Sequence, residues 1–240
     1  MVVKKSRKLG WQVLFRENFI LEFNELDSFT TYYLHCYMLI HLHPDNPQPR
    51  SIKIIVDCLL NGGVIIYPTD TIYGLGCDIL EHRAVERIIQ IKKLHPSKAT
   101  LSFICYNLSD LSRYSKSIST PLFRILKNHL PGPYTFILPA SKQVPKMLKS
   151  KKDTIGLRIP DNTIARTIVR ELSHPILSTS LPGEKVEEYT DPELIHENFG
   201  NLVDIVVDGG IGNTVPSTVI DLTSGKPVLI RMGLGEWPDN

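Results

Sequence analysis

Hydroxyl side chains gather directly after one apolar run of the sequence. Residues 64–67 are β-branched or aromatic and end at a proline, a pattern that predicts a buried strand opening into a loop over residues 68–78. Thr69, Thr71 and Tyr73 in that loop offer neutral hydrogen-bond donors and acceptors, and the two glycines that follow would let the backbone approach a ligand closely. The segment suits a small polar ligand, although an ordinary strand–loop–helix connection has the same pattern.

Two basic residues lie in settings that could bind an anion. Arg158 interrupts the apolar run 154–159, and a partly buried arginine needs an anion or several hydrogen-bond acceptors. Lys92 comes at the end of a helical pattern over residues 84–92, where the helix dipole alone favours a cation. The sequence therefore indicates ligand contact more strongly for Arg158 than for Lys92.

Serine and arginine side chains recur at further predicted strand ends. Ser178 and Ser180 end one strand, Ser217 precedes another, and Arg231 closes the last. Hydroxyls in these places, with basic residues nearby, describe a polar cleft that accepts an anion. The histidines form neither H-x-x-x-H nor H-E-x-x-H, and the sequence contains no spacing typical of a hydrolytic triad. We therefore predict neither a metal site nor a hydrolase.

The elements that must position these residues follow from hydrophobic periodicity and turn residues. Apolar residues at helical spacing alternate with short β-branched runs, in an irregular order that favours an α/β or α+β fold with a mixed sheet over a regular doubly wound one. Helices are expected over residues 52–60, 84–92, 120–129, 163–172 and 191–199, and strands over 64–67, 101–105, 134–138, 154–159, 175–178, 203–207, 218–222 and 228–231.

The nearly neutral net charge conceals an uneven distribution. Fourteen basic and two acidic residues over 87–158 give +12, whereas five basic and thirteen acidic residues over 159–240 give −8. Charge sorted in this way can form a positive surface for a polyanion. The alternative, lysines scattered over solvated helix faces, remains open at this point.

Composition excludes several classes of protein. No apolar run approaches the roughly 20 residues that span a bilayer, so we expect no membrane segment. The four cysteines are widely spaced and form no C-x-x-C pair, which is typical of reduced thiols in a cytoplasmic protein.

The first 37 residues differ from the rest of the chain. They hold eight of the nineteen aromatic residues, one glycine and no proline, and no capping residue frames a helix there. The usual turn and capping residues between predicted strands and helices are found only after Met38, which could itself be an initiator. We therefore predict an extension over 1–37, either poorly packed or an artefact of start-site choice, and a single domain over 38–240.

Five segments, taken in order, resemble the YrdC/Sua5/YciO family over about 41–237. They read Tyr-Pro-Thr-Asp-Thr-Ile-Tyr-Gly-Leu-Gly-Cys-Asp from Tyr67, Leu-Pro-Gly-Pro-Tyr-Thr from Leu130, Ile-Gly-Leu-Arg-Ile-Pro from Ile155, Leu-Ser-Thr-Ser from Leu177, and Pro-Ser-Thr-Val-Ile-Asp from Pro216. The resemblance implies a twisted mixed sheet flanked by helices, with a concave basic cleft.

The resemblance also implies a reaction. YrdC and Sua5 proteins are nucleotidyltransferases that make threonylcarbamoyl-AMP from L-threonine, bicarbonate and ATP with Mg²⁺, release pyrophosphate and so supply a tRNA modification. By this resemblance Lys92 would face the phosphates and Arg158 would lie where amino acid and triphosphate meet. The remaining residues divide into a threonine side (Thr69, Thr71 and Tyr73) and a nucleotide side (Ser178, Ser180, Ser217 and Arg231).

Two departures from the synthase pattern bear on activity. Leu94 stands where the synthases have the arginine of a Lys-x-Arg motif, and Pro182 stands where they have the asparagine of Ser-x-Asn. Leucine cannot replace a bidentate guanidinium. The segments His-Pro-Asp-Asn-Pro-Gln from His43 and Leu-Ser-Thr-Ser-Leu-Pro-Gly from Leu177 resemble the YciO branch more closely. We therefore expect this protein to be similar to that branch, to bind nucleotide and to have weak or altered synthase activity. The alternative is a non-catalytic protein that binds double-stranded RNA or tRNA through its basic segment.

Overall fold

The computed structural model describes residues 2–5, 11–14, 20–22, 38–93, 101–148, 150, 153–183 and 189–238. The chain divides into two compact units, Met1–His35 and Cys36–Asn240. In the first unit β1 (Val2–Lys5), β2 (Trp11–Leu14) and β3 (Ile20–Glu22) form an antiparallel sheet in the order β1-β2-β3. The predicted poor packing of residues 1–37 concerns side chains that lie outside the described part of the chain.

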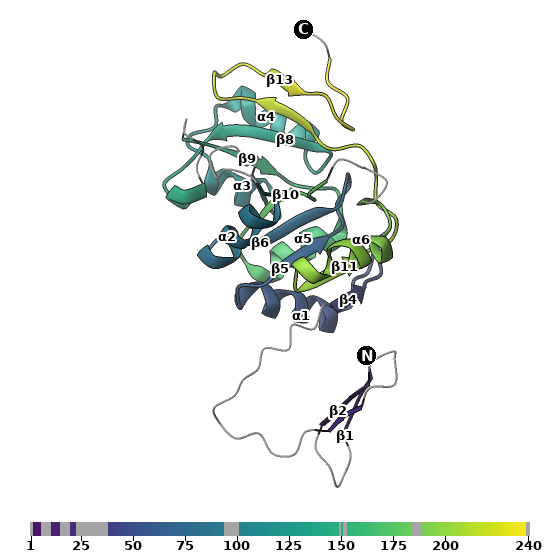
Figure 1. The fold of residues 1–240 in the computed structure, drawn as a ribbon. Helices are drawn as coiled ribbons and strands as arrows, with labels where there is room; N and C mark the ends of the chain where they lie inside the picture. Colours follow the sequence, from purple (N-terminus) through teal and green to yellow (C-terminus); the bar gives the residue numbers. More distant parts are fainter. Residues whose placement is uncertain are drawn as a thin grey trace. The chain divides into compact units, whose positions relative to one another are not determined.

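The second unit is built on a ten-stranded mixed sheet in the order β13-β12-β8-β9-β7-β10-β6-β5-β11-β4 (Figure 1). The sheet contains parallel pairs, such as β7 with β9, and antiparallel pairs, such as β10 with β6. Its strands are β4 (Met38–His41), β5 (Val64–Tyr67), β6 (Gly74–Asp78), β7 (Ser102–Ile104), β8 (Tyr134–Pro139), β9 (Thr154–Arg158), β10 (Ile176–Ser180), β11 (Ile205–Asp208), β12 (Thr218–Asp221) and β13 (Val228–Arg231).

Helices cover both faces of this sheet. The α-helices are α1 (Pro49–Leu60), α2 (His82–Ile91), α3 (Leu108–Tyr114), α4 (Thr120–His129), α5 (Thr163–Leu172) and α6 (Pro192–Phe199), with short 3-10 turns η2 (Lys146–Leu148) and η4 (Gly200–Leu202). The apolar faces of α1 and α5 pack in one core, and those of α2, α3, α4 and α6 in the other. The predicted α/β fold with a mixed sheet flanked by helices is confirmed.

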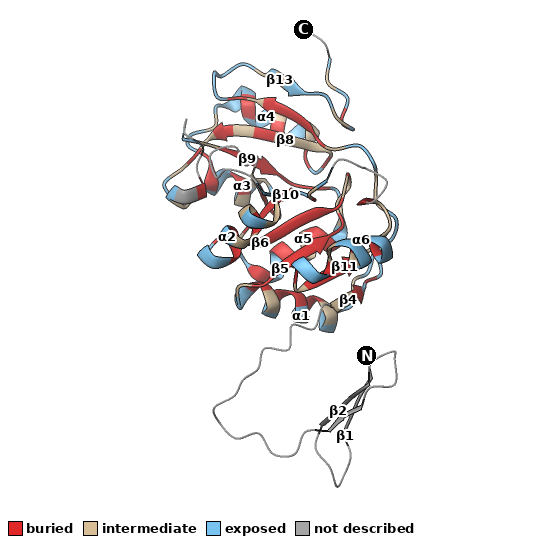
Figure 2. Cartoon of the chain, viewed as in Figure 1, coloured by how far each residue is buried: buried red, intermediate tan, exposed pale blue. Residues whose placement is uncertain are grey.

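Strand β5 shows how the sheet separates these two cores. Val64 and Ile66 join one core, and Ile65 and Tyr67 the other, because successive side chains of a strand point to opposite faces. All four residues are buried, and Figure 2 shows the same burial along the central strands. A continuous apolar run is what a strand covered on both faces requires.

The predicted loop over 68–78 is wrong in its second half, because Gly74–Asp78 forms strand β6 antiparallel to β5. The two glycines serve this pairing. A Cβ on Gly74 would lie 3.0 Å from the ring of Tyr67, and one on Gly76 would lie 2.9 Å from the same ring and from the carbonyl of Leu177. These glycines therefore admit a tyrosine ring, where the sequence suggested that they admit a ligand.

Among the described residues, no helix has the length and apolar character needed to cross a membrane. Cys58, Cys77 and Cys105 are free thiols. Burial raises the pKa of Cys58 to about 12 and raises the pKa of both other thiols as well. A raised pKa keeps a thiol protonated and unreactive at neutral pH, so these cysteines act as packing residues.

Candidate functional site

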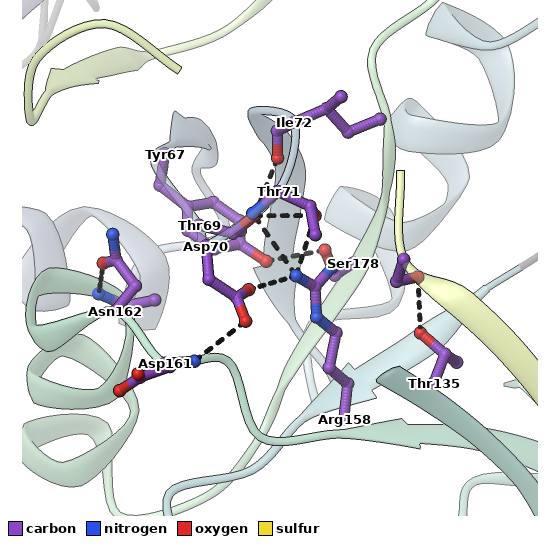
Figure 3. A network of polar contacts seen from close by, with 12 residues as sticks. Tyr67, Thr69, Asp70, Thr71, Ile72, Thr135, Arg158, Asp161, Asn162 and Ser178 are labelled. Carbon is purple, nitrogen blue, oxygen red and sulfur yellow. Dashed lines mark hydrogen bonds and ion pairs between the residues drawn. The ribbon is translucent and has the colours of Figure 1, made fainter. Parts of the chain in front are cut away.

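A buried arginine joins two segments that are distant in the sequence. Arg158 ends β9, and its side chain is only 9% exposed. Its Nη2 donates to the carboxylate of Asp70, to Oγ1 of Thr71 at 2.8 Å and, weakly, to Oγ1 of Thr69 at 3.4 Å (Figure 3). The loop after β5 thus supplies the acceptors that a buried guanidinium requires.

This loop is held in shape by its own hydrogen bonds. The hydroxyl of Thr69 accepts from the backbone N–H of Thr71 at 3.0 Å and donates to the carbonyl of Ile72 at 2.8 Å. The second carboxylate oxygen of Asp70 accepts from the N–H of Asp161 at 3.1 Å, which ties the loop to the segment after β9. We call Thr69, Asp70, Thr71 and Arg158 the arginine cluster.

Ser178 lies in the middle of β10, opposite Gly76 of β6 and Ser102 of β7. The wholly buried hydroxyl of Tyr67 donates to its Oγ at 2.6 Å. Figure 3 shows the hydrogen bond between Tyr67 and Ser178. Burial raises the pKa of Tyr67 well above its usual range, whereas the hydrogen bond with Ser178 and the charge of Arg158 lower it, so the phenol remains a donor. Tyr67 therefore links Ser178 to the electrostatic surroundings of Arg158.

Lys92, at the end of α2, contacts the next part of β10. Its Nζ donates to the carbonyl of Ser180 at 2.9 Å, to the hydroxyl of Ser180 at 3.1 Å and to the carbonyl of Leu181 at 3.0 Å. Burial lowers the pKa of Lys92, because the three acceptors are neutral and no carboxylate compensates its desolvation. Lys92 and Ser180 are thus brought together as the sequence suggested.

Ser217 and Arg231 form a third contact between predicted residues. Nε and Nη2 of Arg231 donate to the carbonyl of Ser217 at 3.2 and 2.8 Å, and the Ser217 hydroxyl lies 2.9 Å from that of Thr135. The pKa of Arg231 is lowered, first by desolvation and then by the positive charge of Arg158. The charge of Arg158 thus acts on Arg231.

Tyr73 lies apart from the other predicted threonine-side residues. Its hydroxyl donates to the carbonyl of Gly210 at 2.6 Å and accepts from the N–H of Gly209 at 3.3 Å, whereas Thr69 and Thr71 contact Arg158. Burial raises the pKa of Tyr73.

Sequence reasoning missed three residues that organise the site: Tyr67, Asp70 and Thr135. Tyr67 and Asp70 belong to the same motif as Thr69 and were passed over, Tyr67 as a strand residue and Asp70 without a role. Thr135 ends the segment Leu-Pro-Gly-Pro-Tyr-Thr that carries part of the resemblance, but was interpreted only as part of a turn that leads into a strand. Within the described ranges, no three His, Cys, Asp or Glu side chains form a group that could hold a metal ion.

Chemically, the assembled residues are hydroxyl donors and cations, with one carboxylate. Such a set can bind and neutralise a polyanionic ligand, and can catalyse by positioning and by stabilising charge.

Comparison with known proteins agrees with this picture. The model of the Sua5/YciO/YrdC family, described as "Telomere recombination", matches residues 57–233. The chain is 45% identical to Escherichia coli YciO over 199 residues, which is 82% of the chain and 95% of that protein. The YciO crystal structure superposes with a TM-score of 0.77 at 44% identity, over 83% of this chain and 97% of that one.

Synthases are more distant relatives. The chain is 31% identical to a Coxiella burnetii threonylcarbamoyl-AMP synthase over 178 residues, which is 74% of the chain and 95% of the synthase. The structure of Pyrococcus abyssi Sua5 in complex with L-threonine has a TM-score of 0.72 at 30% identity, over 82% of this chain and 57% of that one. The chain therefore belongs to the Sua5/YciO/YrdC family.

Proposed function

We propose that this protein binds ATP and L-threonine and forms threonylcarbamoyl-AMP with weak or altered activity, as a nucleotidyltransferase related to the synthases. The observation that carries the proposal is the arginine cluster. Arg158 is 7% exposed and is surrounded by hydroxyls, and its Nε has no hydrogen-bond partner among the described residues. A buried N–H donor without a partner supports contact with an anionic ligand.

In this proposal the residues belong to a threonine side and a nucleotide side of the site. Thr69 and Thr71 lie on the threonine side, with Tyr73 closing that side through the turn at Gly209 and Gly210. The nucleotide side consists of Lys92, Ser178, Ser180, Ser217 and Arg231. Mg²⁺ enters with ATP as part of the substrate complex.

The reaction needs positioning more than covalent chemistry. The amine of L-threonine takes up carbon dioxide derived from bicarbonate, and one carbamate oxygen then attacks the α-phosphorus of ATP. The bond between the α-phosphorus and the bridging oxygen breaks, and pyrophosphate leaves with the electron pair. Arg158 and Arg231 would offset the negative charge that develops on the phosphate oxygens.

The expectation of altered activity is supported by the segment around Pro182. Lys92 binds the carbonyls of Ser180 and Leu181, and the hydroxyl of Tyr189 donates to the carbonyl of Pro182 at 2.6 Å. Proline contributes no side-chain amide here, so the donor that the synthases have at this position is missing. Leu94 lies outside the described residues, but its side chain has no donor either.

Pyrophosphate release from ATP, measured with and without L-threonine and bicarbonate beside a full-motif synthase, tests the proposal. We expect release that depends on both co-substrates and is much slower than in that synthase. Pyrophosphate release that does not depend on L-threonine would contradict the proposed function, and so would the absence of ATP binding in calorimetry.

A second proposed function is binding of double-stranded RNA or tRNA, and it is favoured by a group of basic residues. The end of α3 lies beside the segment after β8. The N–H of Lys116 donates to the carbonyl of Pro139 at 2.8 Å, and the N–H of Ser141 donates to the carbonyl of Tyr114 at 2.9 Å. Four exposed basic residues of these two segments form no ion pair within the described part of the chain: Arg113, Lys116, Lys142 and Lys146. Arg124 and Lys127 of α4 are also exposed and form none there.

Unpaired exposed cations bind nucleic-acid phosphates by releasing counterions, without reading bases. Filter binding of tRNA at several salt concentrations tests this function. Lys116→Glu with Lys142→Glu should weaken binding and flatten its salt dependence, whereas Lys53→Glu, at an exposed lysine of α1 that pairs with Asp57, should change binding less. If Lys53→Glu weakens tRNA binding as much as the Lys116→Glu and Lys142→Glu pair does, these basic residues do not form a specific RNA-binding surface.

A further inference from the structure

The contact between Asp70 and Arg158 limits what the guanidinium can offer to a ligand. Asp70 and Arg158 are 10% and 9% exposed, and Nη2 of the arginine donates to Asp70 and to Thr71. Nη2 carries two N–H groups, so these two acceptors occupy both. The weaker contact with Thr69 shares the same nitrogen.

A guanidinium binds a carboxylate or phosphate in bidentate fashion along one of two edges. One edge pairs Nε with Nη2, and the other pairs Nη1 with Nη2, so each edge includes Nη2. In Arg158 this nitrogen is bound to the loop after β5, and Nε has no partner in the described part of the chain. An anionic ligand can therefore bind Arg158 along a bidentate edge only by displacing Asp70 or Thr71 from Nη2, and Asp70 is the charged one of these two acceptors.

The negative charge of Asp70 also weakens the attraction of Arg158 for an anionic ligand. The Asp70 carboxylate neutralises Arg158 at close range in a buried setting, where screening by water is weak. Arg231 donates to the Ser217 carbonyl and has no carboxylate partner among the described residues, so it contributes a net positive charge. The pKa of Arg231 is lowered first by desolvation and then by the charge of Arg158. Asp70 thus cancels about half of the positive charge that these two arginines present.

We propose that Asp70 competes with the phosphate groups of the nucleotide for Arg158 and thereby sets an upper limit on how tightly the site holds them. The proposal rests on the proposed function, because it assumes that Arg158 faces the nucleotide. Asp70 is then a specificity-determining residue. It leaves Arg158 as a single-donor contact, so that pyrophosphate formed in the reaction is held weakly and can leave.

Titration calorimetry with sodium pyrophosphate, on the full chain at low salt, tests this role. Asp70→Asn keeps the size of the side chain and removes its charge. We expect about tenfold tighter binding of pyrophosphate, the effect of removing one like charge several ångströms away at an intermediate effective dielectric constant. The matched control is Asp161→Asn. It removes the same charge from an exposed residue that contacts Asp70 only through its backbone N–H, and should change affinity less than about twofold.

A second variant keeps the inference testable if Asp70→Asn does not fold. Arg158→Lys keeps the charge but has no bidentate edge. Because the wild-type contact uses one N–H, this variant should lose no more than about threefold in pyrophosphate affinity, whereas a lost bidentate contact would cost about tenfold or more.

The outcomes separate this inference from the proposed function. Weaker pyrophosphate binding by Asp70→Asn, or a tenfold loss in Arg158→Lys, while the wild type still binds ATP, would overturn the role of Asp70 alone. If neither the wild type nor Asp70→Asn binds pyrophosphate or ATP, both the inference and the proposed function are wrong.

Discussion

Tyr67 donates a hydrogen bond of 2.6 Å to the hydroxyl of Ser178, across 111 residues of sequence and from a position without solvent exposure. The phenol proton is committed to this contact, so the proton of Ser178 is free to point at another acceptor. Gly74 and Gly76 pack on the tyrosine ring and fix its position. Tyr67 therefore makes Ser178 a donor toward the site.

The first prediction tests this relationship. Tyr67→Phe removes only the hydroxyl and should weaken ATP binding by about three- to tenfold, the effect of one neutral hydrogen bond. Ser178→Ala should weaken ATP binding as well, and the double variant should be weaker than wild type by less than the product of the two effects, because both changes disrupt one unit.

Calorimetry on the two single variants and the double variant completes this cycle. Tyr114→Phe is the control, since that buried tyrosine packs against Phe103 in the core that contains α2, α3 and α4. It should leave ATP affinity unchanged. Effects of Tyr67→Phe and Ser178→Ala that simply multiply would show that the two hydroxyls act independently.

The second prediction concerns Arg231. Replacing it with alanine should weaken ATP binding by about 1.5–3 kcal/mol, the range for a hydrogen bond to a charged group, and toward the lower end because the residue is exposed. The fold should remain intact, because β13 is an edge strand. Unchanged ATP affinity in calorimetry, with an unchanged melting temperature, would remove Arg231 from the nucleotide side.

The third prediction restores the synthase donors. Leu94→Arg combined with Pro182→Asn should raise the rate of threonylcarbamoyl-AMP formation at least about tenfold, because each change returns a polar group that can stabilise developing charge. Leu94→Met with Pro182→Ala changes the same positions without adding donors and should leave the rate low. An unmodified protein as fast as a full-motif synthase would show that the two departures do not matter.

Much of the fold could be predicted because hydrophobic periodicity and the capping and turn residues indicate the same element boundaries. The bounds 120–129, 163–172 and 228–231 coincide with α4, α5 and β13. Proline at the first turn of α4 and a left-handed residue at the end of α5, Ser173, mark these boundaries in the structure.

The misses have particular causes. Strand β6 reads as a loop because Gly74 and Gly76 lack β propensity, and only the tyrosine ring across the pair explains them. Helix α3 has seven residues, too few for a periodic signal, although Asn107 accepts from the N–H of Asp110 and is a readable cap. The Asp70–Arg158 pair needed the sheet topology, because 88 residues separate the partners.

The fourth prediction concerns alkaline pH. Burial raises the pKa of Cys58 from 9.0 and of Tyr114 from 10.0, each to about 12, and raises the pKa of Cys77, Cys105, Tyr67 and Tyr73 in the same direction. For such groups the native state keeps protons that the unfolded state releases. Their contribution to stability is therefore complete below the unfolded pKa and is lost as pH rises toward the folded pKa.

The free energy of unfolding should accordingly fall from about pH 9 upward, as urea titrations at a series of pH values can measure. Lys92 has a lowered pKa and acts in the opposite sense, but it is one group against seven, because the pKa of Tyr134 is raised as well. Tyr114→Phe should reduce the slope above pH 10, whereas Tyr134→Phe, at a more exposed ring, should reduce it less. Stability that is constant or rising between pH 9 and 11 would contradict this account.

The last prediction concerns the N-terminal unit. Cys36–Asn240 forms a compact unit of its own, and its first strand, β4, begins at Met38 and pairs in parallel with β11. A chain that starts at Met38 keeps this whole strand, including the hydrogen bond from Met38 N to the carbonyl of Asp204. It should therefore melt within a few degrees of the full chain in calorimetry and bind ATP equally well.

A chain that starts at Pro44 is the control. It loses β4, which exposes β11 as a new edge, and should be clearly less stable. A large loss of stability on removal of residues 1–37 alone would show that these residues contribute to the fold of the α/β unit.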